Sequence, residues 1–195
     1  MSATLATLST CKLTAQTVMC MYNAAKIASN LFLTHKIENF AKEPFSEKSL
    51  NYISEMDQSK FEELEQQIIH ALTHAESVVK AIYVKNLTEA HCRGDIDWLT
   101  FCRMNFILSQ TFTFDLKTLV LYYNDEISEE ITTNRMYFFA QLGLVDYTHA
   151  MSTEVHDLFN KNDFGANFIK CALPQLNEES KKRCKKTEEF VDEYL

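Results

Sequence analysis

The fold of this chain is decided by the stretch Arg93-Gly94-Asp95-Ile96-Asp97-Trp98-Leu99-Thr100-Phe101-Cys102-Arg103-Met104-Asn105-Phe106-Ile107-Leu108, which continues to Phe114. Arg103 is the only charged residue between Asp97 and Asp115, and apolar side chains cover more than one helical face. A helix that is apolar nearly all round is either buried on all sides or lies in a membrane. Polar residues interrupt this stretch, whereas a bilayer-spanning helix needs ~20 mostly apolar residues. We therefore expect a buried central helix that amphipathic helices surround.

The residues before Trp98 predict where that helix begins. Gly94 breaks the preceding helix, and Asp95 or Asp97 supplies the N-cap oxygen. Asp97 also places a negative charge at the positive end of the helix dipole.

Composition favours helices throughout. The chain has 195 residues with only 3 Gly and 2 Pro, which leaves few residues for the tight turns of a many-stranded sheet. Leu, Ala, Glu, Lys, Gln and Met are frequent between these breaks, and they favour helix. The expected fold is all-α: one globular helical bundle over residues 1–195, with a polar tail helix from about residue 175.

Apolar residues at helical spacing predict the surrounding helices. They indicate one or two amphipathic helices between Leu5 and Ile37 and a short helix after Ser46. Ser59 and Glu62 have the spacing of a capping box, which predicts a helix from there to His74. Further helices are expected from Val78 to near Gly94 and from Glu126 to about Phe159, the latter with a break at Gly143.

Charge and cysteine spacing exclude several classes of protein. The net charge of −8 argues against a general nucleic-acid binder, which needs a basic face. No positively charged start precedes an apolar core at the N-terminus, so we expect a cytoplasmic chain. The cysteines form no Cys-x-x-Cys pair and are expected to be free thiols; they are Cys11, Cys20, Cys92, Cys102, Cys171 and Cys184.

Candidate chemistry is sparse. His70 and His74 are four residues apart, a spacing that can place two imidazoles on one metal ion, but no third ligand is evident nearby. Two surface histidines are the simpler interpretation. No nucleophile motif, phosphate-binding glycine loop or His-Glu-x-x-His motif is present. We therefore predict a protein that is not an enzyme and that holds no cofactor or metal.

The segment Cys92-Arg93-Gly94-Asp95-Ile96-Asp97-Trp98 is similar to the first homology motif of the Bcl family of apoptosis regulators. That motif is an acidic and glycine-containing turn, an aliphatic residue, Asn or Asp, and then Trp, and it opens the family's buried central helix. Residues 31–37 resemble the end of the family's first helix, and residues 52–57 resemble its third motif. The second motif has two candidates, residues 162–169 and residues 122–137.

The resemblance implies a survival protein, similar to diverged soluble viral members, that sequesters the amphipathic death-motif helix of pro-apoptotic Bcl family proteins. The partner-binding groove it implies comprises Leu64, Ile68, Leu87, His91, Ile96, Asp97, Trp98, Thr100, Phe101 and Arg103. Two features depart from the family. Leu99 and Thr100 stand where the family usually has Gly-Arg, so Arg103 is the candidate to replace that arginine. The C-terminus is charged, so no membrane anchor is expected.

Two other functions stay open from the sequence. One is an unrelated all-α interaction module, such as an adaptor or a helical cytokine, and the other is a helical metalloenzyme that uses His70 and His74. A homodimer also stays open for a chain with this many aromatic residues.

Overall fold

A computed structural model describes residues 31–126, 133–149 and 157–178. These residues divide into two units, one ending at Gln110 and the other beginning at Thr111, and each is described by itself. The prediction of a single domain over the whole chain stays a prediction. The expected helices before residue 31, most of the tail helix from about residue 175, and Cys11, Cys20 and Cys184 lie outside the described residues.

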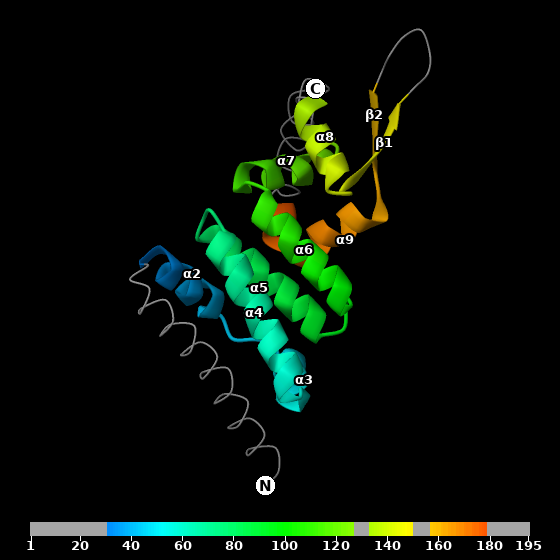
Figure 1. Cartoon of the computed structure of the whole chain (residues 1–195). Helices are drawn as coiled ribbons and strands as arrows, with labels where there is room; N and C mark the ends of the chain where they lie inside the picture. Colours follow the sequence, from blue (N-terminus) through cyan, green and yellow to red (C-terminus); the bar gives the residue numbers. More distant parts are fainter. Residues whose placement is uncertain (1–30, 127–132, 150–156, 179–195) are drawn as a thin grey trace, which may run out of the picture. The chain divides into compact units, whose positions relative to one another are not determined.

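The described part of the first unit, residues 31–110, has five helices (Figure 1): α2 (Leu31–Ala41), α3 (Glu47–Glu55), α4 (Gln58–His74), α5 (Val79–Cys92) and α6 (Trp98–Gln110). Helix α5 contacts each of the other four, and buried residues line it on all sides. The central helix of this unit is therefore α5.

The sequence-based expectation that α6 is the buried central helix is thus wrong. Helix α6 buries Phe101, Met104 and Ile107, but Leu99 and Phe106 are 78% and 56% exposed. The sequence did not identify α5 as the central helix because α5 contains lysines, which are usually exposed. Lys80 and Lys85 look like surface residues in the sequence, yet they are only 1% and 7% exposed.

Buried lysines bind backbone carbonyls at places where the helices leave them unpaired. Lys80 Nζ donates to the Leu108 carbonyl at 2.6 Å, in the last turn of α6, and also pairs with the carboxylate of Glu76. Lys36 Nζ donates to the Leu72 carbonyl at 2.7 Å, in the last turn of α4. The final carbonyls of a helix lack helical partners and carry its negative dipole, so an ammonium group is favourable there.

Short-range signals set the ends of these helices. Ser46 accepts a hydrogen bond from the Ser49 N–H and begins α3, as predicted. The predicted capping box at Ser59 is wrong, because Asp57 is the N-cap of α4 and accepts from the Lys60 N–H. Asp57 precedes the helix with extended backbone, whereas Ser59 already lies inside it.

Helix α5 ends at Cys92, two residues before Gly94, and the sequence predicted an end near Gly94. Gly94 has a φ of +79°, and its N–H donates to the His91 carbonyl while the Asp95 N–H donates to the Ala90 carbonyl. This pair of bonds is the Schellman motif, which needs a left-handed residue at that position. Asp97, one of the two predicted N-cap residues, then begins α6 by accepting from the Thr100 N–H at 2.7 Å.

The second unit contains α7 (Thr113–Tyr123), α8 (Thr133–Gln141), an antiparallel hairpin of β1 (Val145–His149) and β2 (Asp157–Lys161), and α9 (Asp163–Ala172). The prediction of a helix from Glu126 to about Phe159 is therefore wrong for residues 145–149 and 157–159, which lie in strands, while residues 127–132 and 150–156 lie outside the described residues. Gly143, where a break was predicted, follows the end of α8. The hairpin also corrects the all-α prediction to a mostly helical fold.

Aromatic packing explains why residues 145–149 form a strand. Tyr147 lies opposite Phe159 in the hairpin register, with ring centroids 5.5 Å apart. Tyr137 of α8 contacts both rings, each at 5.1 Å. Residues directly opposite each other on paired strands share one face of the sheet, so these rings face α8 together.

None of the described helices is long and apolar enough to span a membrane.

Candidate functional site

The predicted groove residues separate into a buried set and an exposed set. Leu64, Ile68, Leu87 and Phe101 are at most 4% exposed and belong to the core of the first unit. Ile96 is also buried. Asp97 and Arg103 are exposed, and Thr100 is half-buried. These buried residues pack in the core of the first unit, and partner binding by the set as a whole stays a prediction.

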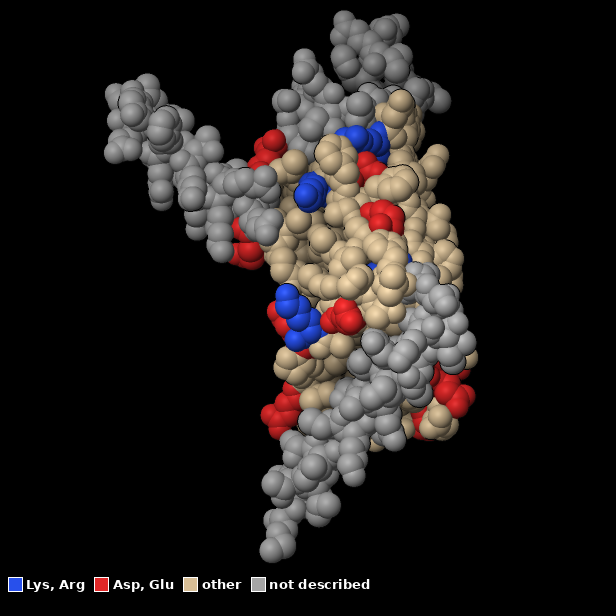
Figure 2. Space-filling view, turned by 90° about the vertical axis from the view of Figure 1, so that its left-hand side faces the viewer, with Lys and Arg blue, Asp and Glu red and all other residues tan. Residues whose placement is uncertain are grey.

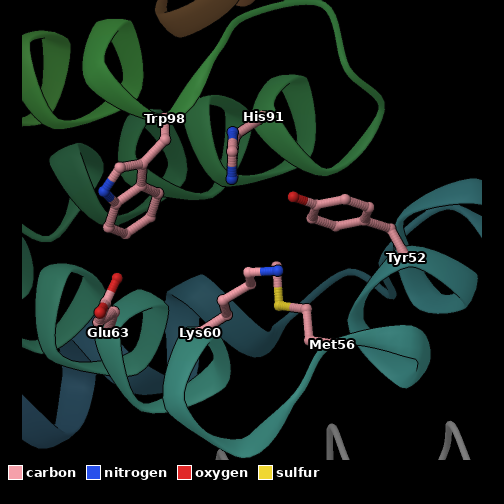
Figure 3. A pocket seen from close by; sticks show the side chains of 6 residues that line it. All are labelled: Tyr52, Met56, Lys60, Glu63, His91 and Trp98. Carbon is pink, nitrogen blue, oxygen red and sulfur yellow. The ribbon is translucent and has the colours of Figure 1, made fainter.

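Two of the predicted residues, His91 and Trp98, line an open hollow in the first unit with a volume of about 190 Å³. Four further residues complete its lining: Tyr52, Met56, Lys60 and Glu63. Figure 3 shows Trp98 and Tyr52 on opposite sides of the hollow, with His91 between them and Met56 and Lys60 across from it. Helices α3, α4, α5 and α6 and the turn after α3 all contribute.

The aromatic rings form one contact cluster that reaches from the core to the hollow. His91 stacks on the buried Phe101 ring with centroids 5.1 Å apart. Trp98 contacts both His91 and Phe101, at 5.4 Å in each case, and Tyr52 meets His91 edge-on at 5.7 Å. Such offset and edge-to-face contacts stabilise aromatic pairs. The hollow thus has a firmly held aromatic wall.

The orientation of His91 follows from one hydrogen bond. Its Nδ1 lies 3.2 Å from the Ile96 carbonyl oxygen, which can only accept a hydrogen bond. Nδ1 therefore carries the donated proton. In the neutral ring this leaves Nε2 as an acceptor.

The charged residues of the hollow lie at its α4 side. Lys60 Nζ is 3.2 Å from the Asp57 carboxylate, and both side chains are well exposed. Burial raises the pKa of the Cys102 thiol of α6, and the charge of the nearby Glu63 adds to this effect. One cation and one anion thus border an otherwise apolar and aromatic hollow.

A second, shallower hollow of about 310 Å³ adjoins the first and shares Tyr52 as a lining residue. Its other residues are Lys48, Asn51, Glu55, Cys92, Arg93 and Gly94. Arg93 donates to Glu89 at 3.0 Å and to Asp95 at 2.9 Å, so two carboxylates hold its guanidinium group. Tyr52 thus separates two neighbouring depressions between α3 and the turn that joins α5 to α6.

The second hollow is lined by one thiol, that of the buried Cys92. Burial raises the pKa of the Cys92 thiol to about 12, and the charge of Glu89 adds to this effect, so Cys92 is a poor nucleophile. Among the residues that the structure describes, no group of three His, Cys, Asp or Glu side chains could hold a metal ion. The first hollow is smaller than the ~300–1,000 Å³ typical of small-molecule pockets and suits a single side chain.

The surface in Figure 2 shows charged side chains of both signs scattered among other residues. On this face the described residues form no extended basic patch of the kind that binds nucleic-acid backbones.

Sequence reasoning found two of the six residues that line the first hollow and missed the other four. One usable signal was the spacing of Tyr52, Met56 and Lys60, which are four residues apart. That spacing looks like one helical face, but α3 ends between them, with Met56 at its C-cap. The hollow lies at this break between helices.

Comparison with known proteins found no match to any family model, any curated protein or any solved structure.

Proposed function

We propose that this protein binds an amphipathic helix of a partner protein and that the hollow at Trp98 receives the principal apolar side chain of that helix. The observation that carries the proposal is the half-buried Trp98, which borders an open aromatic hollow instead of being sealed in the core. Buried aromatic anchors and the pockets that receive them dominate the energetics of protein interfaces.

The size and lining of the hollows support a helix as the ligand. A helix presents apolar side chains at i, i+3, i+4 and i+7, which fit separate depressions along a groove. The two adjoining hollows on either side of Tyr52 offer two such positions. Burial of one large apolar side chain contributes roughly 1.5–3 kcal/mol before the costs of ordering the partner.

The resemblance of residues 92–98 to the first Bcl motif names the partner class to test first, the death-motif helix of pro-apoptotic proteins. Binding such a helix would make the protein a survival factor. Thr100 stands where the family carries an arginine that pairs with the ligand's aspartate, so a bidentate partner is missing there. We therefore expect a narrow range of ligands.

The test is calorimetric titration of a panel of death-motif peptides into the purified protein. We expect at least one peptide to bind, and Trp98→Ala to weaken that binding more than tenfold, because the variant removes the wall of the hollow. Phe101→Ala is the less informative variant, because Phe101 is fully buried and its loss opens a core cavity.

Leu99→Ala is the matched control. Leu99 is the next residue of α6, is 78% exposed and does not line either hollow. The affinity of the Leu99→Ala variant for the peptide should stay near that of the wild type. Circular dichroism checks that this variant and Trp98→Ala both fold. Failure of every death-motif peptide to bind rejects the survival role, and equal effects of the two variants reject the hollow as the site.

A thiol count separates this proposal from a disulfide-linked, cytokine-like protein. The cysteines in the described part of the chain, Cys92, Cys102 and Cys171, form no disulfide bond. We expect titration of the unfolded, unreduced protein to find all six cysteines of the sequence as thiols.

A further inference from the structure

A pair of histidines lies on the surface of α4, away from the hollow. His70 and His74 occupy the last two turns of the helix, and both side chains are exposed. Their ring centroids are 4.2 Å apart, with a tilt of 35° between the rings. Residues four apart share one helical face, so both imidazoles project from the same patch of surface.

One hydrogen bond prepares His74 as a metal ligand. Its Nδ1 lies 2.9 Å from the His70 carbonyl oxygen, so Nδ1 must donate the proton. The neutral ring then carries its free lone pair on Nε2. Metal-binding histidines commonly donate their second ring nitrogen to a backbone carbonyl, which fixes both the tautomer and the ring orientation.

The surroundings of the histidine pair contain one feature that favours a cation and one that opposes it. The pair lies at the C-terminal end of α4, where the helix dipole is negative. The Lys36 ammonium group already binds the Leu72 and Thr73 carbonyls at that end, at 2.7 and 3.3 Å. The helix end is thus partly neutralised, so the two imidazole lone pairs must supply most of the binding.

We propose that His70 and His74 form a two-imidazole site for a divalent first-row transition metal. Imidazole nitrogen suits Cu²⁺, Ni²⁺ and Zn²⁺, and the usual order of affinity places Cu²⁺ first. Mg²⁺ prefers oxygen ligands and does not bind here. The described residues offer no third protein ligand, so water completes the coordination, and the site differs from the three-ligand centre of a typical zinc enzyme.

The test uses the full chain and the metal ions alone. Calorimetry should show binding in the order Cu²⁺ above Ni²⁺ and Zn²⁺, with no heat from Mg²⁺, and the bound metals should raise the melting temperature because they bind the folded helix. His70→Ala and His74→Ala should each weaken Ni²⁺ binding at least tenfold, since each leaves a single imidazole. Both residues are exposed, so we expect both variants to fold.

His35→Ala is the control. His35 is also exposed, but it lies on α2 and contacts Glu38 at 3.0 Å instead of a second histidine, so its loss should leave the Ni²⁺ affinity unchanged. The proposal is overturned if the wild type binds no Ni²⁺, or if the His70 and His74 variants bind it as well as the wild type does. Peptide binding at the Trp98 hollow is a separate measurement, so either proposal can fail alone.

Discussion

Helices α6 and α9 both begin with a side-chain N-cap, but the hydrogen-bond partners of the two N-cap residues come from very different parts of the chain. Asp97 Oδ1 accepts from the Thr100 N–H at 2.7 Å, and Asn162 Oδ1 accepts from the Gly165 N–H at 2.8 Å. The turn before α6 is closed by hydrogen bonds among residues 89–100. Asn162, in contrast, also donates to the Gly143 carbonyl and to the Asp146 carboxylate.

A tyrosine hydroxyl connects the start of α9 to two other segments of the second unit. Tyr123 Oη accepts from the Asn162 N–H at 3.0 Å and donates to the Leu144 carbonyl at 2.6 Å. The end of α7, the turn after α8 and the start of α9 therefore meet at one atom. A helix start whose hydrogen-bond partners are a few residues away can be predicted from a short stretch of sequence. A helix start whose partners are far along the chain depends on tertiary structure, which a short stretch of sequence does not show.

The strongest test of this difference is the same substitution in both turns. Gly165→Ala should lower the free energy of unfolding by about 3 kcal/mol, the upper end of the overpacking range. A Cβ at Gly165 would collide with the Leu144 carbonyl oxygen and with the Tyr123 hydroxyl, and a backbone oxygen cannot yield cheaply. Urea denaturation of both variants measures the effect.

Gly94→Ala is the comparison within the α6 turn. A Cβ at Gly94 meets open space, and the strain comes from the φ of +79° alone, which costs about 1–2 kcal/mol. If Gly94→Ala lowers the free energy of unfolding as much as Gly165→Ala does, then the tertiary contacts around the start of α9 do not make it more sensitive to substitution than the start of α6.

Removal of one hydroxyl should have the next largest effect. Tyr123→Phe deletes the oxygen that bonds to both Leu144 and Asn162, and we expect a loss of about 2 kcal/mol because half-buried backbone groups lose their partner. Burial raises the pKa of the Tyr123 hydroxyl, so it stays a donor at neutral pH. Thermal unfolding with near-ultraviolet circular dichroism follows the change.

Tyr122→Phe is the matched variant for that measurement. The Tyr122 hydroxyl donates to the Phe159 carbonyl at 2.7 Å, and its loss should cost about 1 kcal/mol. Equal losses from the two tyrosines would mean that the junction at Tyr123 adds nothing beyond a single hydrogen bond.

The same contrast explains how much of the fold the sequence could predict. Gly94, Asp97 and Ser46 act within a few residues of their partners, and the helix boundaries they predicted are confirmed. The hairpin was missed because Val145 and the apolar residues before it also fit a helical period. Strand pairing between residues 145–149 and 157–161 is what makes them strands.

The central helix and the hollow were harder for the same reason. Lys80 is buried because the Leu108 carbonyl, 28 residues away, accepts its hydrogen bond. A hydropathy pattern contains no information about that partner. Trp98 was predicted because it belongs to the segment that resembles the first Bcl motif, and His91 because it directly precedes that segment. Tyr52 and Glu63 reach the hollow from other helices through tertiary packing.

The smallest expected effect concerns the charge at the α6 start. The Thr100 N–H bonds the Asp97 carboxylate and lowers its pKa, with help from the Thr100 side chain. The folded state thus binds a proton less readily than the unfolded chain. The resulting stabilisation is complete above the usual pKa of an aspartate and is lost as the pH falls through the lowered value.

Asp97→Asn isolates this charge, because asparagine keeps the N-cap oxygen. The variant should melt slightly below the wild type at pH 7, and the gap in melting temperature should close as the pH falls through the folded pKa of Asp97. Subtracting the two proteins at each pH cancels the titration of all other groups. A gap that stays constant down to strongly acid pH would show that the carboxylate charge does not stabilise the turn, and that a neutral oxygen at residue 97 is sufficient for this locally closed start.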